Sequence, residues 1–106
     1  FKSVQEAMID ADVVMALRIQ LERQKSGLFP SLAEYNRFFG IDEKRLMFAK
    51  DDAFIMHPGP VNRGVELSSE IVDGDRSAIC RQVTNGVAVR MSVMDWLING
   101  SEEDAQ

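Results

Sequence analysis

The chain has 106 residues, 45% of them hydrophobic, and carries 17 acidic against 12 basic side chains, for a formal net charge of −5. This size allows one domain with a modest core, and the charge disfavours nucleic acid and anionic membrane surfaces as partners. With one cysteine, Cys80, and one histidine, His57, neither an internal disulfide nor a Cys/His zinc cluster is expected. No apolar run approaches the ~20 residues of a membrane helix, so we expect a cytoplasmic protein.

The first third of the chain predicts a helix, a buried strand and a polar loop. Ser3 and Glu6 have the spacing of a capping box, which starts a short helix to about Ile9. The apolar run 12–17 is typical of a strand covered on both faces in a parallel sheet. Residues 18–30 are then expected to form a long loop at the strand end, where ligand sites are common.

The middle of the chain repeats this alternation of helix and strand. A second capping box at Ser31 opens a helix that Gly40 is expected to stop at the C′ position. Asp42 can cap a further helix, which leads into the apolar strand 52–57. The predicted fold class is α/β, with part of a doubly wound parallel sheet and flanking helices. Because two strands make no stable sheet of this kind, and the chain begins at Phe1, we expect the rest of the sheet to lie upstream in a longer polypeptide.

The last part of the chain is expected to be mainly helical. One short helix is expected around residues 69–72, and two more within 77–98, because Asn85–Gly86 disfavours one unbroken helix. Asn99–Gly100 is the expected stop, and the tail 101–106 is expected to fray. The second of the two helices carries an apolar face at helical spacing, formed by Val87, Met91, Met94 and Leu97.

Large apolar side chains are expected to fill the core rather than to form a binding surface. These are the six methionines and the aromatic residues Phe38, Phe39, Phe48 and Phe54. The sequence has no internal repeat and no phosphate-loop, dinucleotide, zinc or serine-hydrolase signature.

The turn His57-Pro58-Gly59-Pro60 is the first candidate site. Its prolines lack backbone donors and Gly59 lets a ligand approach the main chain, so bare carbonyls are offered to an amide or amine. The Gly59–Pro60 peptide bond is a candidate for the cis configuration. Considered alone, the turn favours a plain structural interpretation over a binding site, and His57 is interpreted as structural rather than as a base.

The second candidate site is Arg18, Gln20 and Glu22, whose side chains would project to one side of an extended chain. A guanidinium can hold a carboxylate bidentately, Gln20 can add a donor, and Glu22 can orient the guanidinium. The alternative is a solvated loop face with a surface ion pair worth roughly 0 to 1 kcal/mol. The polar segments 62–66 and 81–86 are likewise open to simple turn chemistry.

The order and spacing of three motifs resemble aspartate carbamoyltransferase over essentially the whole chain, most closely its bacterial forms. The motifs are Arg18-x-Gln20-x-Glu22-Arg23, His57-Pro58-Gly59-Pro60-Val61-Asn62-Arg63, and Gln82-Val83-Thr84-Asn85-Gly86-Val87-Ala88-Val89-Arg90. The resemblance implies transfer of a carbamoyl group from carbamoyl phosphate to L-aspartate, which gives N-carbamoyl-L-aspartate and phosphate in de novo pyrimidine biosynthesis. It implies no metal and no organic cofactor.

The resemblance also implies residue roles. Arg18 would bind an aspartate carboxylate, with Gln20 helping and Glu22 orienting the guanidinium. Residues 31–40 would belong to a mobile region that closes over the substrate.

On the carbamoyl side, the main-chain oxygens of Pro58 and Gly59 would meet the carbamoyl nitrogen or the incoming amine, with the peptide bond before Pro60 cis to aim them. His57 would not be the catalytic histidine of the family.

The family has two α/β domains and forms homotrimers that share active sites between subunits and can join a larger assembly. Residues 1–84 would be the C-terminal part of the aspartate-binding domain, and 85–100 a helix that packs back on the carbamoyl-phosphate domain. The family's phosphate-binding loop, its carbonyl-polarising histidine and its second aspartate-binding arginine have no counterpart here. This chain alone is therefore expected to be inactive.

Two alternatives stay open. The chain could serve a carbamoyltransferase for another amino acid, although an ornithine enzyme would place a cysteine where Pro58 stands and would not need Arg18. It could also be a noncatalytic scaffolding or allosteric module, against which the retention of Arg18, Gln20 and the Pro-rich turn argues.

Overall fold

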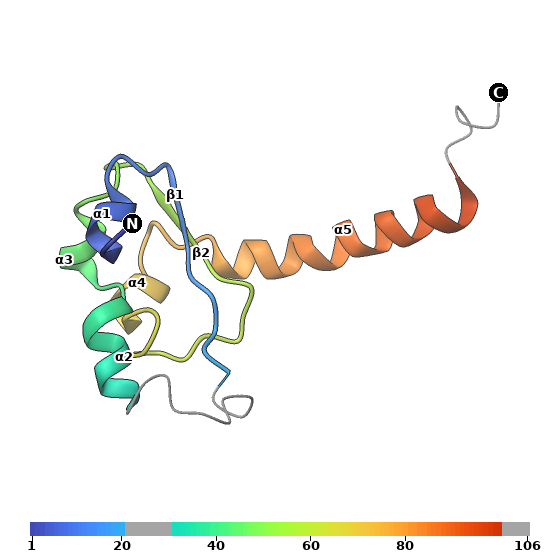
Figure 1. Cartoon of the computed structure of the whole chain (residues 1–106). Coiled ribbons are helices and arrows are strands. Elements are labelled where there is room, and N and C mark those ends of the chain that lie inside the picture. Colours follow the sequence, from blue (N-terminus) through green and yellow to red (C-terminus); the bar gives the residue numbers. More distant parts are fainter. Residues whose placement is uncertain (21–30, 101–106) are drawn as a thin grey trace.

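The computed structural model describes residues 1–20 and 31–100, and its helices and strands alternate along the chain (Figure 1). β1 and β2 pair in parallel, with Val14 opposite Ile55. The α/β class and the parallel pairing expected from the sequence are confirmed. The elements are α1 (Val4–Met8), β1 (Val13–Met15), α2 (Leu32–Phe39), α3 (Glu43–Leu46), β2 (Phe54–Met56), α4 (Ser69–Val72) and α5 (Ile79–Asn99).

The first three helices begin at the side-chain caps that the sequence predicts. In each, an oxygen of the capping residue accepts a hydrogen bond from a backbone N–H of the first turn, which would otherwise lack a partner. These bonds run from Glu6 N to Ser3 Oγ (3.1 Å), from Glu34 N to Ser31 Oγ (3.1 Å) and from Arg45 N to Asp42 Oδ1 (2.9 Å).

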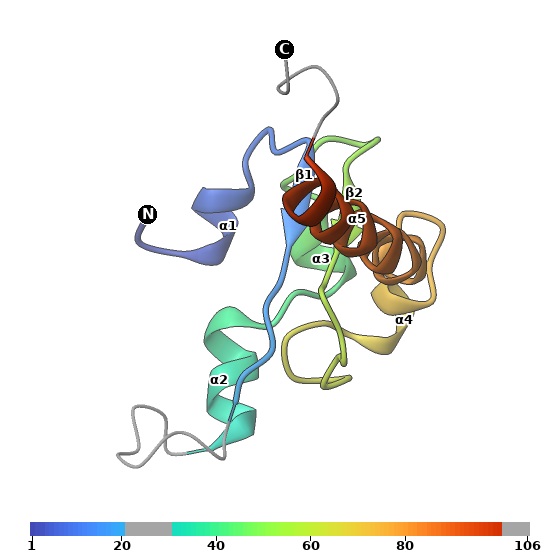
Figure 2. The same cartoon turned by 90° about the vertical axis from the view of Figure 1, so that its right-hand side faces the viewer.

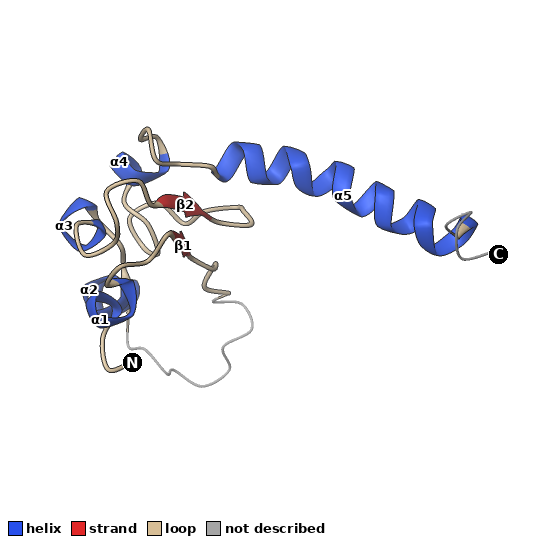
Figure 3. Ribbon diagram, turned by 90° about the horizontal axis from the view of Figure 1, so that it is seen from above, coloured by secondary structure: helices blue, strands red, loops and turns tan. Residues whose placement is uncertain are grey.

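The core lies on one side of the two-stranded sheet. Figure 3 shows α1, α2 and α3 together to one side of the strands. Val14 and Ile55 point into the core, whereas Val13, Met15 and Phe54 on the other face are 41%, 52% and 43% exposed. The expectation that the strand within 12–17 is covered on both faces is therefore wrong for the described residues. The core is completed by Met8, Ile41, Leu46, Ala49, Ala53, Leu67, Ile71 and Ile79.

The expected core of aromatic and methionine side chains is also wrong. Phe38, Phe39, Phe48 and Phe54 are all more than 40% exposed, and Met8 is the one buried methionine among the described residues. Aliphatic side chains fill the interior instead. The rings of Phe38 and Phe39 on α2 are both partly exposed, with centroids 6.4 Å apart.

Residues Ile79–Asn99 form one unbroken helix, α5, and not the two helices predicted around Asn85–Gly86. A single glycine costs about 1 kcal/mol relative to alanine within a helix, which the flanking turns of α5 outweigh. The predicted stop is confirmed, since α5 ends at Asn99 and Gly100 has a φ of +71°. Within the described ranges, no helix combines the length and apolar character needed to cross a bilayer.

α5 leaves the body of the molecule and contacts it only near its first turn, where Ile79 is buried (Figures 1 and 2). The radius of gyration is 17.5 Å, against about 13 Å for a compact chain of this length. The predicted apolar face is consequently open to solvent, with Val87, Met91, Met94 and Leu97 between 54% and 71% exposed.

Gly40 ends α2 as predicted, but through close packing rather than a left-handed cap. Its φ is −62°, which any residue can adopt. A Cβ at this position would lie 2.7 Å from the Asn36 carbonyl oxygen and 2.8 Å from that of Val65. Arg45 of α3 adds to the crowding, because its guanidinium donates to the carbonyls of Arg37 and Gly40 at this helix end.

His57, the last residue before the Pro-rich turn, is fully buried. Its Nδ1 accepts a hydrogen bond from Gly59 N (2.8 Å), and its own N–H donates to Gln82 Oε1 (2.8 Å). Burial lowers the pKa of His57, and the negative charge of Glu66 opposes this only in part. The imidazole is therefore a neutral structural group near pH 7, in agreement with its sequence interpretation.

We predict that Gly40→Ala destabilises the fold by about 1–3 kcal/mol, because the added methyl group meets two backbone oxygens that cannot move independently. Gly86→Ala is the matched control: its Cβ meets nothing closer than 3.6 Å, and we expect it to be neutral or stabilising by up to about 1 kcal/mol. Urea unfolding monitored by circular dichroism measures both. Equal stability of the two variants would contradict the crowding at Gly40.

We further predict that stability falls as the pH drops below about 6.5, the ordinary pKa of histidine. Below this pH, His57 is protonated in the unfolded chain more readily than in the folded chain, where its pKa is lowered, so protonation favours unfolding. His57→Asn keeps an acceptor for Gly59 but removes this titration. The urea midpoint should therefore drop less between pH 7.5 and pH 5.5 in His57→Asn than in the unaltered chain. An equal drop in both proteins would show that protonation of His57 does not cause the loss of stability.

Candidate functional site

The two candidate segments leave the sheet at the same edge. β1 and β2 are parallel neighbours, so the chain after Met15 and the turn after Met56 emerge side by side. The pairing continues one residue beyond the strands, where Ala16 N donates to Met56 O (3.1 Å). Figure 1 shows both chains running in the same direction from the ends of the strands.

The turn after β2 presents carbonyl groups, as the sequence predicts. Gly59 has a φ of +73°, and the Gly59–Pro60 peptide bond is cis, the configuration expected from the sequence. Pro58 and Pro60 are exposed above the buried His57. The Gly59 N–H is already used by His57 Nδ1, and no described residue donates to the carbonyl oxygens of Pro58 or Gly59. The turn can therefore accept hydrogen bonds from a bound molecule.

The segment after β1 carries Arg18 and Gln20, both exposed, and leaves the sheet at the same edge as this turn. Ile19, which lies between them, is half-buried, and both its backbone N–H and its carbonyl are hydrogen-bonded to side chains. Glu22, the residue expected to orient the Arg18 guanidinium, lies outside the described residues.

Glu66 connects the two segments and was missed as a site residue by the sequence reasoning. Its side chain is 2% exposed, and its Oε1 accepts from Ile19 N (2.9 Å) and Asn62 Nδ2 (3.0 Å). Its Oε2 accepts from Asn62 N (3.0 Å). Asn62 Nδ2 in turn donates to Ile19 O (3.3 Å). A carboxylate between Val65 and Leu67, both apolar, is the sequence signal that could have identified this buried group.

α2 borders the same region through Tyr35. Burial, and secondly the negative charge of Glu66, raise the pKa of Tyr35, so its hydroxyl stays protonated at physiological pH. Tyr35 and Phe39, within the residues 31–40 that are expected from the sequence to close over a substrate, lie near the end of β1. A cavity of about 300 Å³ separates α2 from the end of β1 and is lined by Val4, Met15, Ala16, Leu17, Tyr35, Phe39, Ile41 and Glu66.

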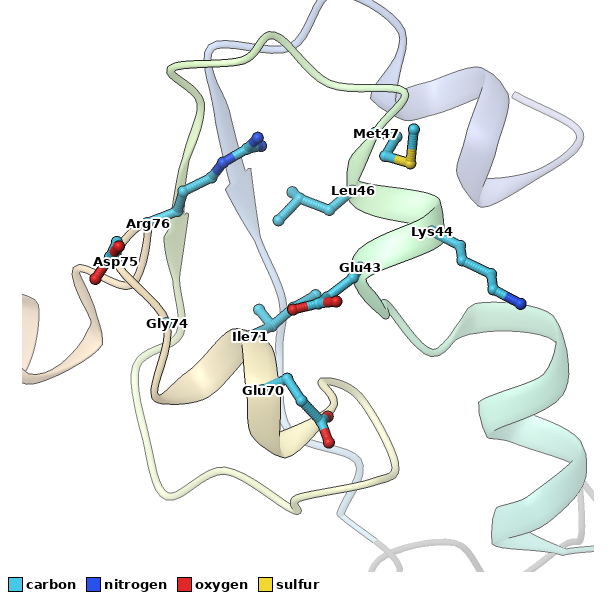
Figure 4. Close-up of a pocket in the computed structure, with 9 residues that line it drawn as sticks. All are labelled: Glu43, Lys44, Leu46, Met47, Glu70, Ile71, Gly74, Asp75 and Arg76. Carbon is cyan, nitrogen blue, oxygen red and sulfur yellow. The ribbon is translucent and has the colours of Figure 1, made fainter.

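A further cavity of about 470 Å³ lies away from the candidate residues, between α3 and α4. Figure 4 shows Glu43 reaching from α3 toward Ile71 on α4. None of the residues expected to bind substrate lines it. Among the described residues, no three His, Cys, Asp or Glu side chains are grouped so that they could hold a metal ion.

The loop between the turn and α4 is held by its own ion pair. The Arg63 guanidinium donates to both oxygens of Asp73 (2.7 and 2.8 Å). These hydrogen bonds, and then the positive charge, lower the pKa of the Asp73 carboxyl. Both side chains are largely exposed, so the pair fixes the course of the loop more than it stabilises the fold.

Solved structures of two kinds of carbamoyltransferase share this fold. Aspartate transcarbamoylase from Trypanosoma cruzi, solved in complex with carbamoyl aspartate and phosphate, superposes with a TM-score of 0.66 at 36% identity, over 85% of this chain and 27% of that one. The same protein has also been solved with carbamoyl phosphate. Anabolic ornithine carbamoyltransferase from Campylobacter jejuni gives a TM-score of 0.76 at 29% identity, over 92% of this chain and 32% of that one.

Comparison of the sequence with curated proteins finds its similar relatives among aspartate carbamoyltransferase catalytic subunits. The aspartate carbamoyltransferase catalytic subunit of Acetivibrio thermocellus is 73% identical over 94 residues, which are 89% of this chain and 30% of the relative. The chain thus spans about a third of the length of the curated relatives it matches. Residues 1–97 match the family model described as aspartate/ornithine carbamoyltransferase, Asp/Orn binding domain. The chain therefore belongs to the aspartate/ornithine carbamoyltransferase family, within its Asp/Orn-binding domain.

Proposed function

We propose that this chain supplies the aspartate-binding part of an enzyme that transfers a carbamoyl group from carbamoyl phosphate to L-aspartate, giving N-carbamoyl-L-aspartate and phosphate in de novo pyrimidine biosynthesis. The observation that carries the proposal is the parallel pairing of β1 and β2, from which the segment with Arg18 and Gln20 and the Pro58–Gly59 turn leave the sheet at the same edge. One segment offers a cation and an amide, and the other offers acceptors only, which suits a carboxylate beside an amine.

On the aspartate side, the Arg18 guanidinium binds the side-chain carboxylate and Gln20 adds a donor. Glu22 orients the guanidinium by pairing with it. The 73% identity to an aspartate carbamoyltransferase catalytic subunit supports aspartate as the acceptor substrate.

On the carbamoyl side, the carbonyl oxygens of Pro58 and Gly59 accept hydrogen bonds from the carbamoyl NH₂ group or from the attacking amine. The amine nitrogen of aspartate forms a bond to the carbamoyl carbon, the bond from that carbon to the phosphate oxygen breaks, and the amine loses a proton. Because no group of this chain is needed as a nucleophile, its contribution to the rate is positioning and charge stabilisation.

Residues 1–84 belong to the aspartate-binding domain in this proposal, and residues 85–100 pack on the carbamoyl-phosphate domain. The solvent-exposed apolar face of α5 supports this arrangement, since such a face needs a partner. The complete enzyme is a cytoplasmic homotrimer. Its phosphate-binding residues and its carbonyl-polarising histidine come from outside this chain.

Aspartate is favoured over ornithine by the turn itself. Position 58 is a proline, where an ornithine enzyme is expected to carry a cysteine, and Arg18 provides the charge for a second carboxylate that ornithine lacks. The ornithine enzyme from C. jejuni shares the fold at a lower identity than the aspartate relatives.

Arg18→Ala, in a chain of the relatives' full length, should raise the KM for aspartate by about 10-fold or more, because a charge-assisted carboxylate contact is worth about 1.5–3 kcal/mol. Steady-state kinetics at saturating carbamoyl phosphate measures the effect. Lys44→Ala, which also removes one exposed positive charge but lies on α3, should leave the KM unchanged. A near-normal aspartate KM in Arg18→Ala would remove Arg18 from the site.

The 106-residue chain by itself should show no turnover, because it lacks the phosphate-binding residues. Supplying a separately expressed carbamoyl-phosphate domain should restore formation of carbamoyl aspartate, measured colorimetrically. Restoration should fail when Met91 and Leu97 on the exposed α5 face are both replaced by Asp. Turnover by the isolated chain would contradict the proposed division of the site.

A further inference from the structure

We propose that Glu66 is a positioning residue for aspartate: its buried carboxylate, together with the Asn62 amide, fixes the backbone of Ile19 so that Arg18 and Gln20 face the substrate beside the Pro-rich turn. This inference rests on the proposed function and deepens it. Glu66 itself touches no substrate.

The contacts fix Ile19 from both sides. Its N–H donates to Glu66 Oε1 (2.9 Å), and its carbonyl accepts from Asn62 Nδ2 (3.3 Å). The two peptide groups of Ile19 are those that join it to Arg18 and to Gln20. Holding them therefore sets the directions in which the flanking side chains leave the main chain, while leaving both side chains exposed for binding.

The chemistry requires a carboxylate at position 66. Three N–H groups converge on its two oxygens, from Ile19 N, Asn62 N and Asn62 Nδ2. A carboxylate is an acceptor only and can receive all three, whereas a glutamine would turn its own NH₂ donors toward at least one of them. Because the site is 2% exposed, water cannot readily compensate for the mismatch.

Further backbone hydrogen bonds fix the loop that carries Glu66 and Asn62. The Glu66 carbonyl accepts from Ile41 N (2.9 Å), and the Asn62 carbonyl accepts from Val65 N (3.0 Å). Asn36 on α2 adds a bond from its Nδ2 to Val65 O (2.9 Å). The loop that carries Glu66 is thus tied to the chain between α2 and α3, and it presents the carboxylate to Ile19 from a fixed position.

The carbonyl-bearing turn does not depend on Glu66 in the same way. The Gly59 N–H donates a hydrogen bond to His57 Nδ1, and the His57 N–H donates to Gln82 Oε1 of α5. Neither hydrogen bond involves Glu66. Loss of the carboxylate should therefore disturb the aspartate side of the site more than the carbamoyl side. A residue that served stability alone would lower the amount of active enzyme and leave the KM for aspartate unchanged.

The test compares Glu66→Gln with Glu70→Gln in a chain of the relatives' full length. Glu70 is exposed on α4, so the control makes the same chemical change away from the sheet edge. Glu66→Gln should raise the KM for aspartate at least 10-fold while the Kd for carbamoyl phosphate, measured by calorimetry, changes less than about 3-fold. Glu70→Gln should match the unaltered enzyme in both.

A folded Glu66→Gln enzyme with an unchanged aspartate KM would overturn the proposal, as would equal losses of affinity for both substrates. If Glu66→Gln does not fold, Asn62→Ala decides, because it removes only the amide bonds to Ile19 and Glu66. Asn62→Ala should raise the aspartate KM about 3-fold or more, and no change would overturn the proposal. Arg18→Ala is measured in parallel to distinguish the two proposals. If Arg18→Ala has no effect on the aspartate KM, the proposed function fails; if it raises the KM while the Glu66 and Asn62 variants do not, only the role of Glu66 fails.

Discussion

The parallel pairing of β1 with β2 is the constraint on which the rest of the structure depends. Only a parallel pair brings two carboxyl-terminal strand ends to one edge, and here those ends carry opposite chemistry. The side chains of Arg18 and Gln20 carry hydrogen-bond donors, and the Pro58–Gly59 turn carries backbone acceptors. The short sheet contributes little binding surface of its own. It brings together segments that lie about 40 positions apart in the sequence. The buried Glu66 then fixes the backbone of the segment after β1 through its hydrogen bond from Ile19 N.

Much of this arrangement could be predicted from the sequence, because the signals are local. The caps at Ser3, Ser31 and Asp42 each depend on a single hydrogen bond to a nearby amide, and the Pro-Gly-Pro turn restricts its own backbone. These features need no knowledge of distant neighbours, so reading them from residue type and spacing succeeds.

The errors arose where distant neighbours decide. Asn85–Gly86 is a locally weak point, yet α5 continues through it because one glycine cannot offset the remaining turns. The apolar run 12–17 predicts a strand covered on both faces, whereas Val13 and Met15 on one face of β1 are open in the described chain. The burial of Glu66 is hard to predict because its partner Ile19 lies 47 residues away, and its apolar neighbours Val65 and Leu67 give only a weak local sign of it.

The packing at Gly40 has a consequence for how the site could close. Arg45 of α3 donates to the last carbonyls of α2, and Gly40 has no space for even a methyl group against the Val65 carbonyl. The junction between the two helices is therefore too crowded to act as a hinge. Any swing of residues 31–40 over a substrate would therefore carry α3 along as a rigid pair with α2.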